Sequence, residues 1–114
     1  MTSTIRTISF NVNGIRARLH QLEQVLKKHK PDVLGLQEIK VCDEDFPTDA
    51  ISAMGYTVDF FGQKGHYGVA LLSKISAKKI VRGYPSDAED AQRRMIHGEY
   101  EFNGRSLHVI NGYF

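Results

Sequence analysis

The sequence is poor in cysteine, in excess charge of either sign and in long apolar runs. A single cysteine, Cys42, among 114 residues excludes an internal disulfide and a cysteine-based zinc site, so we expect a chain that folds in the reducing cytoplasm. Fifteen basic and thirteen acidic residues leave a formal charge of +2, too small to indicate a nucleic-acid partner by itself. No segment approaches the roughly 18 apolar residues of a membrane-spanning helix, and no signal-type stretch is present at the N-terminus. These absences favour a cytoplasmic protein without a membrane partner.

The composition that remains is that of one globular domain. Hydrophobic residues make up 41% of the chain and charged residues 25%, and no repeat, linker or composition break divides it. We therefore expect residues 1–114 to form a single unit. Residues 109–114 read as an apolar strand without a polar tail behind it, so we expect the chain to end inside a larger domain.

The first third of the sequence predicts a strand, a helix and a second strand. Residues 5–10 are β-branched and aromatic and stop at an Asn-Val-Asn-Gly turn, and an apolar stripe of helical spacing begins at Ile15. Pro31 ends this helix, because proline disfavours helical geometry in the residue before it. Residues 33–37 form an unbroken apolar run that predicts a strand buried on both faces, and hence a βαβ unit.

The second half of the sequence predicts mainly strands. A short helix opens at Pro47 and closes at Gly55. Asn103-Gly104 lies between two strand-like segments and predicts a two-residue antiparallel hairpin. The expected strands are residues 56–61, 69–73, 78–82, 94–102 and 107–110.

Polar residues follow three of the predicted strands: Asn11, then Gln37 and Glu38, then Asn111 and Tyr113. Side chains from several strands converge beyond the carboxyl ends of a sheet with parallel connections, and a carboxylate there can hold a hard divalent cation. Taken singly, each residue has a plainer interpretation. Glu38 could be solvated or paired with a neighbouring lysine, and the asparagines could be turn residues.

Five segments together resemble the abasic-site endonuclease branch, of exodeoxyribonuclease III type, of the endonuclease/exonuclease/phosphatase family. They are residues 10–17 (FNVNGIRA), 36–40 (LQEIK), 65–73 (GHYGVALLS), 92–94 (QRR) and 109–114 (VINGYF). The resemblance implies a four-layer α/β sandwich of the DNase I-like fold. The chain would be its truncated N-terminal portion, with a mixed β-sheet and flanking helices, roughly one sheet of the two.

The resemblance also implies roles for particular residues. Glu38 would ligate Mg²⁺ or Mn²⁺, Asn11 would support the metal and the acidic network, and Tyr113 would lie near the scissile phosphate. Lys40 would neutralise the neighbouring carboxylates. The expected contacts with DNA are Arg16, Gly65, His66 and Arg94, and the expected partner is duplex DNA with abasic sites or 3′ ends.

Three elements of the family pattern are missing from the sequence: an Asp-x-Asn element, a later aspartate and a C-terminal Asp-His pair. His97 and His108 lie in strand-like segments, where a place on the sheet surface is the better interpretation. We therefore expect an incomplete catalytic site in the isolated chain. Two alternatives stay open: a phosphatase or phosphodiesterase branch of the same fold, and a noncatalytic folding or DNA-binding fragment. The whole enzyme would be monomeric, whereas an isolated fragment would be prone to self-association.

Overall fold

A computed structural model describes residues 4–63, 67–83 and 93–113 of the chain. The expected DNA contacts Gly65 and His66 lie outside these ranges. In chain order the elements are β1 (Thr7–Asn11), η1 (Arg16–Arg18), α1 (Leu19–His29), β2 (Val33–Gln37), η2 (Asp43–Asp45), α2 (Thr48–Ala53), β3 (Thr57–Gly62), β4 (Gly68–Ser73), β5 (Lys79–Arg82), β6 (Met95–Phe102) and β7 (Arg105–Gly112). No helix within the described ranges is long and apolar enough to cross a bilayer.

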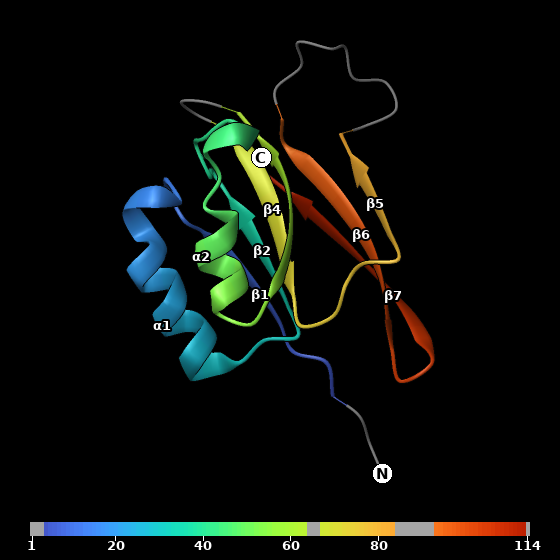
Figure 1. Ribbon diagram of the computed structural model, residues 1–114. Helices are drawn as coiled ribbons and strands as arrows, with labels where there is room; N and C mark the ends of the chain where they lie inside the picture. The colour runs from blue at the N-terminus through green and yellow to red at the C-terminus, as the bar shows by residue number, and fades with distance from the viewer. Residues whose placement is uncertain (1–3, 64–66, 84–92, 114) are drawn as a thin grey trace.

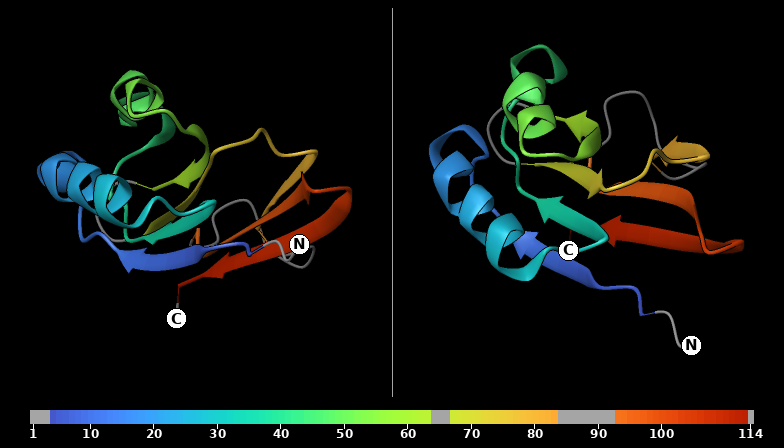
Figure 2. Two further views of the ribbon diagram at one scale, coloured as in Figure 1. Left: turned by 90° about the horizontal axis from the view of Figure 1, so that it is seen from below. Right: turned by 60° about the horizontal axis from the view of Figure 1, so that its bottom comes forward.

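The strands form two sheets. The first has the order β1-β2-β4-β3 and is mixed, since β1 and β2 are parallel and the other neighbours are antiparallel. The second contains β5, β6 and β7 and is antiparallel. The helices cover one face of the first sheet and the second sheet covers the other (Figures 1 and 2). The expectation of roughly one sheet was therefore wrong. Because β4 is buried on both faces, the face turned away from the helices needs a cover of its own, which β5, β6 and β7 provide.

The predicted βαβ unit is confirmed, with one local difference. Helix α1 turns its buried Leu22 and Leu26 toward the first sheet. It ends at Lys30, whose φ of 46° is left-handed, directly before Pro31. The difference lies at the start, where a 3-10 turn precedes the α-helix. Arg18, with φ −121° and ψ 14°, is both the last residue of η1 and the N-cap of α1.

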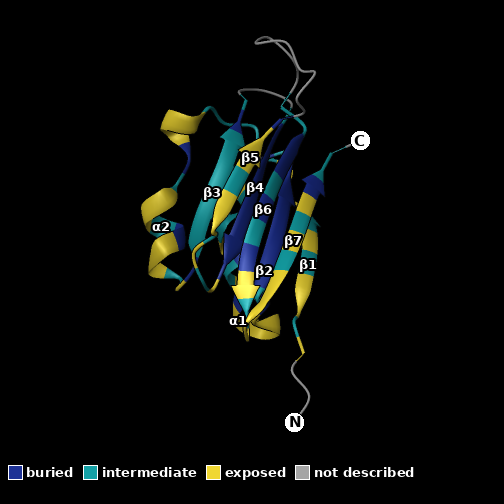
Figure 3. Cartoon of the chain, turned by 90° about the vertical axis from the view of Figure 1, so that its right-hand side faces the viewer, coloured by how far each residue is buried: buried dark blue, intermediate teal, exposed yellow. Residues whose placement is uncertain are grey.

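Strands β2 and β4 are buried along their whole length (Figure 3), which explains their unbroken apolar sequences. Alternate side chains enter two different cores. In β4, Ala70 and Leu72 pack in the core under the helices, whereas Val69 and Leu71 pack against Ile96 of the second sheet. Strands β2 and β4 thus connect the layer of helices and the second sheet, which cover the two faces of the first sheet.

The predicted hairpin between β6 and β7 is also confirmed. Asn103 and Gly104 have φ values of 54° and 78°, as a two-residue turn with two left-handed residues requires. His97 and His108 lie on the outer surface of this hairpin, as expected, with Nε2 of His97 3.0 Å from Nδ1 of His108. The outer surface of the second sheet also exposes Ile110, by 68%.

Candidate active site

The polar residues singled out at the strand ends meet at one end of the two-sheet core. Asn11 ends β1 and Glu38 follows β2. Because these strands are parallel neighbours, both residues lie at the carboxyl ends of the strands, on the same side of the first sheet. Tyr113 follows β7, and its backbone N–H donates to the carbonyl of Arg94 at 2.8 Å, just before β6. The register of β6 and β7 therefore places Arg94, just before β6, beside Tyr113, just after β7.

Glu38 occupies a left-handed turn that the β1 loop holds in place. Its φ is 57°, a value that non-glycine residues adopt rarely. Gly14 donates its N–H to the Glu38 carbonyl at 2.8 Å, and Ile15 donates to the carbonyl of Ile39 at 3.0 Å. Backbone hydrogen bonds from the loop that follows β1 thus fix the backbone that carries the half-buried Glu38 side chain.

The Tyr113 phenol contacts the Glu38 carboxylate directly. Its hydroxyl donates a hydrogen bond of 2.7 Å to Oε1 of Glu38. This bond is the largest cause of a raised pKa for Tyr113, followed by partial burial, while the Arg94 charge acts in the opposite direction. Tyr113 therefore keeps its proton at neutral pH and orients one carboxylate oxygen of Glu38.

Arg94 packs against two tyrosine rings. Its guanidinium carbon is 4.7 Å from the ring centre of Tyr67 and 5.4 Å from that of Tyr113, and the two rings are 6.1 Å apart. These cation–π contacts hold the guanidinium in place, and its Nη1 also donates to the Tyr113 carbonyl at 3.5 Å. No role for Tyr67 was expected from the sequence, where its signal is its place in the segment 65–73 that carries the family resemblance.

The neighbouring Arg93 is held differently. Its Nη1 donates to the carbonyl of Gly62 at 2.6 Å and lies 3.6 Å from Oδ2 of Asp43. Its guanidinium also covers the ring of Phe61 at 4.6 Å. These contacts tie β3, η2 and β6 together and give Arg93 a structural role.

Asn11 and Lys40 meet through Asn13. The Asn11 side-chain oxygen accepts the backbone N–H of Asn13 at 3.1 Å, as in an Asx turn. Nζ of Lys40 donates to the side-chain oxygen of Asn13 at 2.6 Å. Lys40 thus braces the loop beside Glu38 by way of an amide. Arg16 is exposed at the start of η1, three residues beyond Asn13.

The donor atoms suit a hard cation. The carboxylate of Glu38 and the amide oxygen of Asn11 are ligands that Mg²⁺ and Mn²⁺ accept, with water completing the coordination. Within the described ranges, no group of three or more His, Cys, Asp or Glu side chains could hold a metal ion. A divalent cation at this end of the strands would be held by the oxygens of Glu38 and Asn11 and by water.

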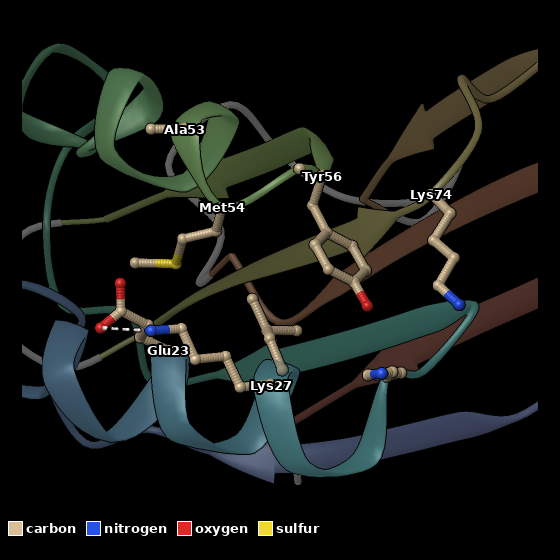
Figure 4. A pocket seen from close by; sticks show the side chains of 9 residues that line it. Glu23, Lys27, Ala53, Met54, Tyr56 and Lys74 are labelled. Carbon is tan, nitrogen blue, oxygen red and sulfur yellow. Dashed lines mark ion pairs between the residues drawn. The ribbon is translucent and has the colours of Figure 1, made fainter.

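A cavity of about 600 Å³ lies elsewhere, between the two helices (Figure 4). Lys30, Gly55 and Lys74 line it near the end of the first sheet where β2 begins, opposite Glu38. Its positive charge is largely offset. Lys27 lies 3.8 Å from Glu23, and Lys74 lies 3.8 Å from Asp32.

The fold and the comparison with known sequences define the class of protein. Residues 8–111 match the Endonuclease/Exonuclease/phosphatase family, and the chain belongs to this family. It is 57% identical over 110 residues to Exodeoxyribonuclease III from Haemophilus influenzae, a match that covers 96% of this chain and 41% of that protein. The chain thus spans about two fifths of this curated relative.

Two solved structures share the fold. An AP endonuclease from Archaeoglobus fulgidus is 38% identical, with a TM-score of 0.85, over 96% of this chain and 41% of that one. A 3′ phosphatase from Neisseria bound to a product DNA hairpin is 34% identical, with a TM-score of 0.87 and the same coverage. The expected DNase I-like fold is therefore confirmed.

Proposed function

We propose that this chain forms part of a DNA repair nuclease that hydrolyses phosphodiester bonds at abasic sites and 3′ ends of duplex DNA with Mg²⁺ or Mn²⁺. The identity to Exodeoxyribonuclease III and the fold shared with an AP endonuclease support this proposal. The observation that carries it is the hydrogen bond of 2.7 Å between Tyr113 and Glu38, beside Arg94 at the open ends of the strands.

These side chains supply part of what phosphodiester hydrolysis requires. Negative charge develops on the phosphate in the transition state, so fixed donors and positive charge nearby lower the barrier. A cation bound at Glu38 and Asn11 would supply Lewis-acid polarisation of a phosphate oxygen. Tyr113 holds the carboxylate in one orientation, and Arg94 adds positive charge at the same edge.

The basic residues at this edge would bind the DNA backbone. Arg94 and the exposed Arg16 would contact phosphates, which gives affinity without sequence preference. Such binding suits a repair enzyme, because damage occurs in any sequence. For Gly65 and His66, contact with DNA rests on the family resemblance alone.

We further propose that the groups that activate water lie in the part of the relatives' domain that this chain does not match. The curated relative is matched over only 41% of its length. The complete protein would be a cytoplasmic monomer, and the isolated chain would bind DNA with little or no turnover.

A chimera tests this function. Residues 5–113 would replace the matching segment of Exodeoxyribonuclease III from Haemophilus influenzae, and Mg²⁺-dependent incision of a duplex with one abasic-site analogue would be measured. We expect incision by the chimera, loss with a chelator, and a loss of at least about 100-fold with Glu38→Gln, as for removal of a group that stabilises the transition state.

The matched control is Glu101→Gln, an exposed site on β6, which should leave incision unchanged. A folded chimera that cuts no DNA but hydrolyses soluble phosphate esters would contradict the nuclease proposal. A duplex with a 3′ phosphate is a second substrate, chosen because a structural neighbour is a 3′ phosphatase.

A further inference from the structure

Asn111 on β7 reaches out of the second sheet and bonds to the backbone of the first. Its side chain is 5% exposed. Its Nδ2 donates at 2.8 Å to the carbonyl of Leu36 in β2 and at 2.8 Å to that of Ala70 in β4. Both donors of one amide are therefore used on neighbouring strands of the opposite sheet.

Gln37 completes this buried network from the other side. Its Nε2 donates to Oδ1 of Asn111 at 2.6 Å and to the Ser9 hydroxyl at 3.1 Å. Gly35 provides the space, because a Cβ atom there would lie 3.0 Å from Cγ of Asn111. We call the Gln37–Asn111 pair with its backbone partners the amide clasp.

The clasp stands directly before both members of the Tyr113–Glu38 pair. Gln37 immediately precedes Glu38, and Asn111 lies two residues before Tyr113. Packing between the apolar faces of two sheets is non-directional and tolerates sliding. Hydrogen bonds to two particular carbonyl groups are directional, and a slip of β7 by one residue would turn Asn111 to the other face.

We propose that Gln37 and Asn111 are positioning residues: the amide clasp sets the end of β7 over β2 so that the Tyr113 hydroxyl meets the Glu38 carboxylate. The catalytic meaning of this positioning rests on the proposed nuclease function. The positioning itself is independent of turnover, and so is its test.

The test is NMR spectroscopy of the 114-residue chain in a chelator, with the nuclear Overhauser effect between the Tyr113 ring and the Glu38 side chain as readout. Gly35→Ala keeps every polar group and crowds Asn111 with one methyl. Gln37→Met replaces the side-chain amide by a thioether of similar size and removes the bonds from Gln37 to Asn111 and Ser9. We expect the Tyr113–Glu38 effect to be lost in both variants, while the amide spectrum of each sheet stays dispersed.

The matched control is Ile96→Val, which removes a methyl from the same inter-sheet core without touching the clasp. It should lower stability and retain the effect. A merely stabilising clasp would leave the Tyr113–Glu38 effect intact in Gly35→Ala and Gln37→Met, and that result would overturn the proposal. If Gly35→Ala does not fold, Gln37→Met decides alone. Absence of incision by the chimera would overturn the nuclease function and leave the spectroscopic result valid.

Discussion

The Tyr113 hydroxyl lies 2.7 Å from the Glu38 carboxylate although 75 residues separate the two in sequence. One follows the last strand of the second sheet and the other follows the central β2 of the first. The candidate active site is thus assembled at the junction of the two sheets. Its geometry depends on how the sheets are packed.

The ionisation of Tyr113 should depend on Glu38. The carboxylate raises the Tyr113 pKa because it accepts a hydrogen bond from the protonated phenol. In Glu38→Gln the neutral amide no longer penalises the phenolate, so the Tyr113 pKa should fall toward the ordinary value of about 10. The measurement is a pH titration of ¹³C-labelled tyrosine in a chelator, with Glu101→Gln as control. An unchanged Tyr113 titration in Glu38→Gln would contradict the hydrogen bond.

The same bond links stability to alkaline pH. A raised pKa in the folded state contributes stability that is fully present below the unfolded pKa, about 10, and is lost as the pH rises through the folded pKa. In Tyr113→Phe, the free energy of unfolding should therefore decrease less steeply above pH 10 than in the unchanged chain. Urea unfolding at several pH values checks this, and an identical pH dependence in both proteins would argue against it.

Two buried tyrosines should respond in opposite ways to loss of the hydroxyl. Tyr56 donates to the Pro31 carbonyl at 2.7 Å, whereas the Tyr100 hydroxyl finds no partner within the described part of the chain. Tyr56→Phe should lower the free energy of unfolding by about 1 kcal/mol, and Tyr100→Phe should leave it unchanged or raise it by about 1 kcal/mol. Urea denaturation of both variants tests this, and equal losses would show that the Tyr100 hydroxyl is hydrogen-bonded.

Tyr100 should be among the last tyrosines to ionise. Burial, and then the negative charge of Asp59, raise its pKa to about 12. Because the shift reflects the cost of a buried phenolate, this group leaves stability unaffected below about pH 10 and lowers it between about pH 10 and 12. Ultraviolet difference spectra of the chain and of Tyr100→Phe should differ only in that upper range. A difference that develops near pH 10 would mean that the ring is accessible to water.

Arg94 should contribute to DNA binding more than Arg82 does. Arg94 packs against two tyrosine rings at the candidate site, whereas Arg82 bonds to the Phe60 carbonyl and lies 3.8 Å from Asp59. In Arg94→Ala, duplex binding should weaken and the slope of log K against log salt should decrease by about 1. Fluorescence anisotropy across salt concentrations measures both quantities. Equal losses in Arg94→Ala and Arg82→Ala would indicate a diffuse basic surface instead.

Much of the local structure was predictable from sequence because short-range physics determines it. The unbroken apolar residues 33–37 predicted a strand buried on both faces, and all five positions are buried. Pro31 predicted the end of α1, and Asn103-Gly104 predicted the turn between β6 and β7. In each case the backbone preference of one or two residues, or a single run of side chains, is sufficient.

The site was only partly predictable. Placing Asn11 and Glu38 at one sheet edge followed from the expected parallel pairing of their strands, and the structure confirms that neighbourhood. The start of a second sheet after β4, the bond from Tyr113 to Glu38, the rings around Arg94 and the amide clasp were not predictable, because each joins segments distant in sequence.

The sequence by itself thus determined where the strands, helices and turns lie and which polar side chains stand at the strand ends. Only the tertiary structure decided that those ends meet, since the sheet of β5, β6 and β7 packs on the first sheet. The physical reason is that backbone preferences act over a few residues. The approach of Tyr113 to Glu38 depends instead on directional hydrogen bonds and packing between two sheets.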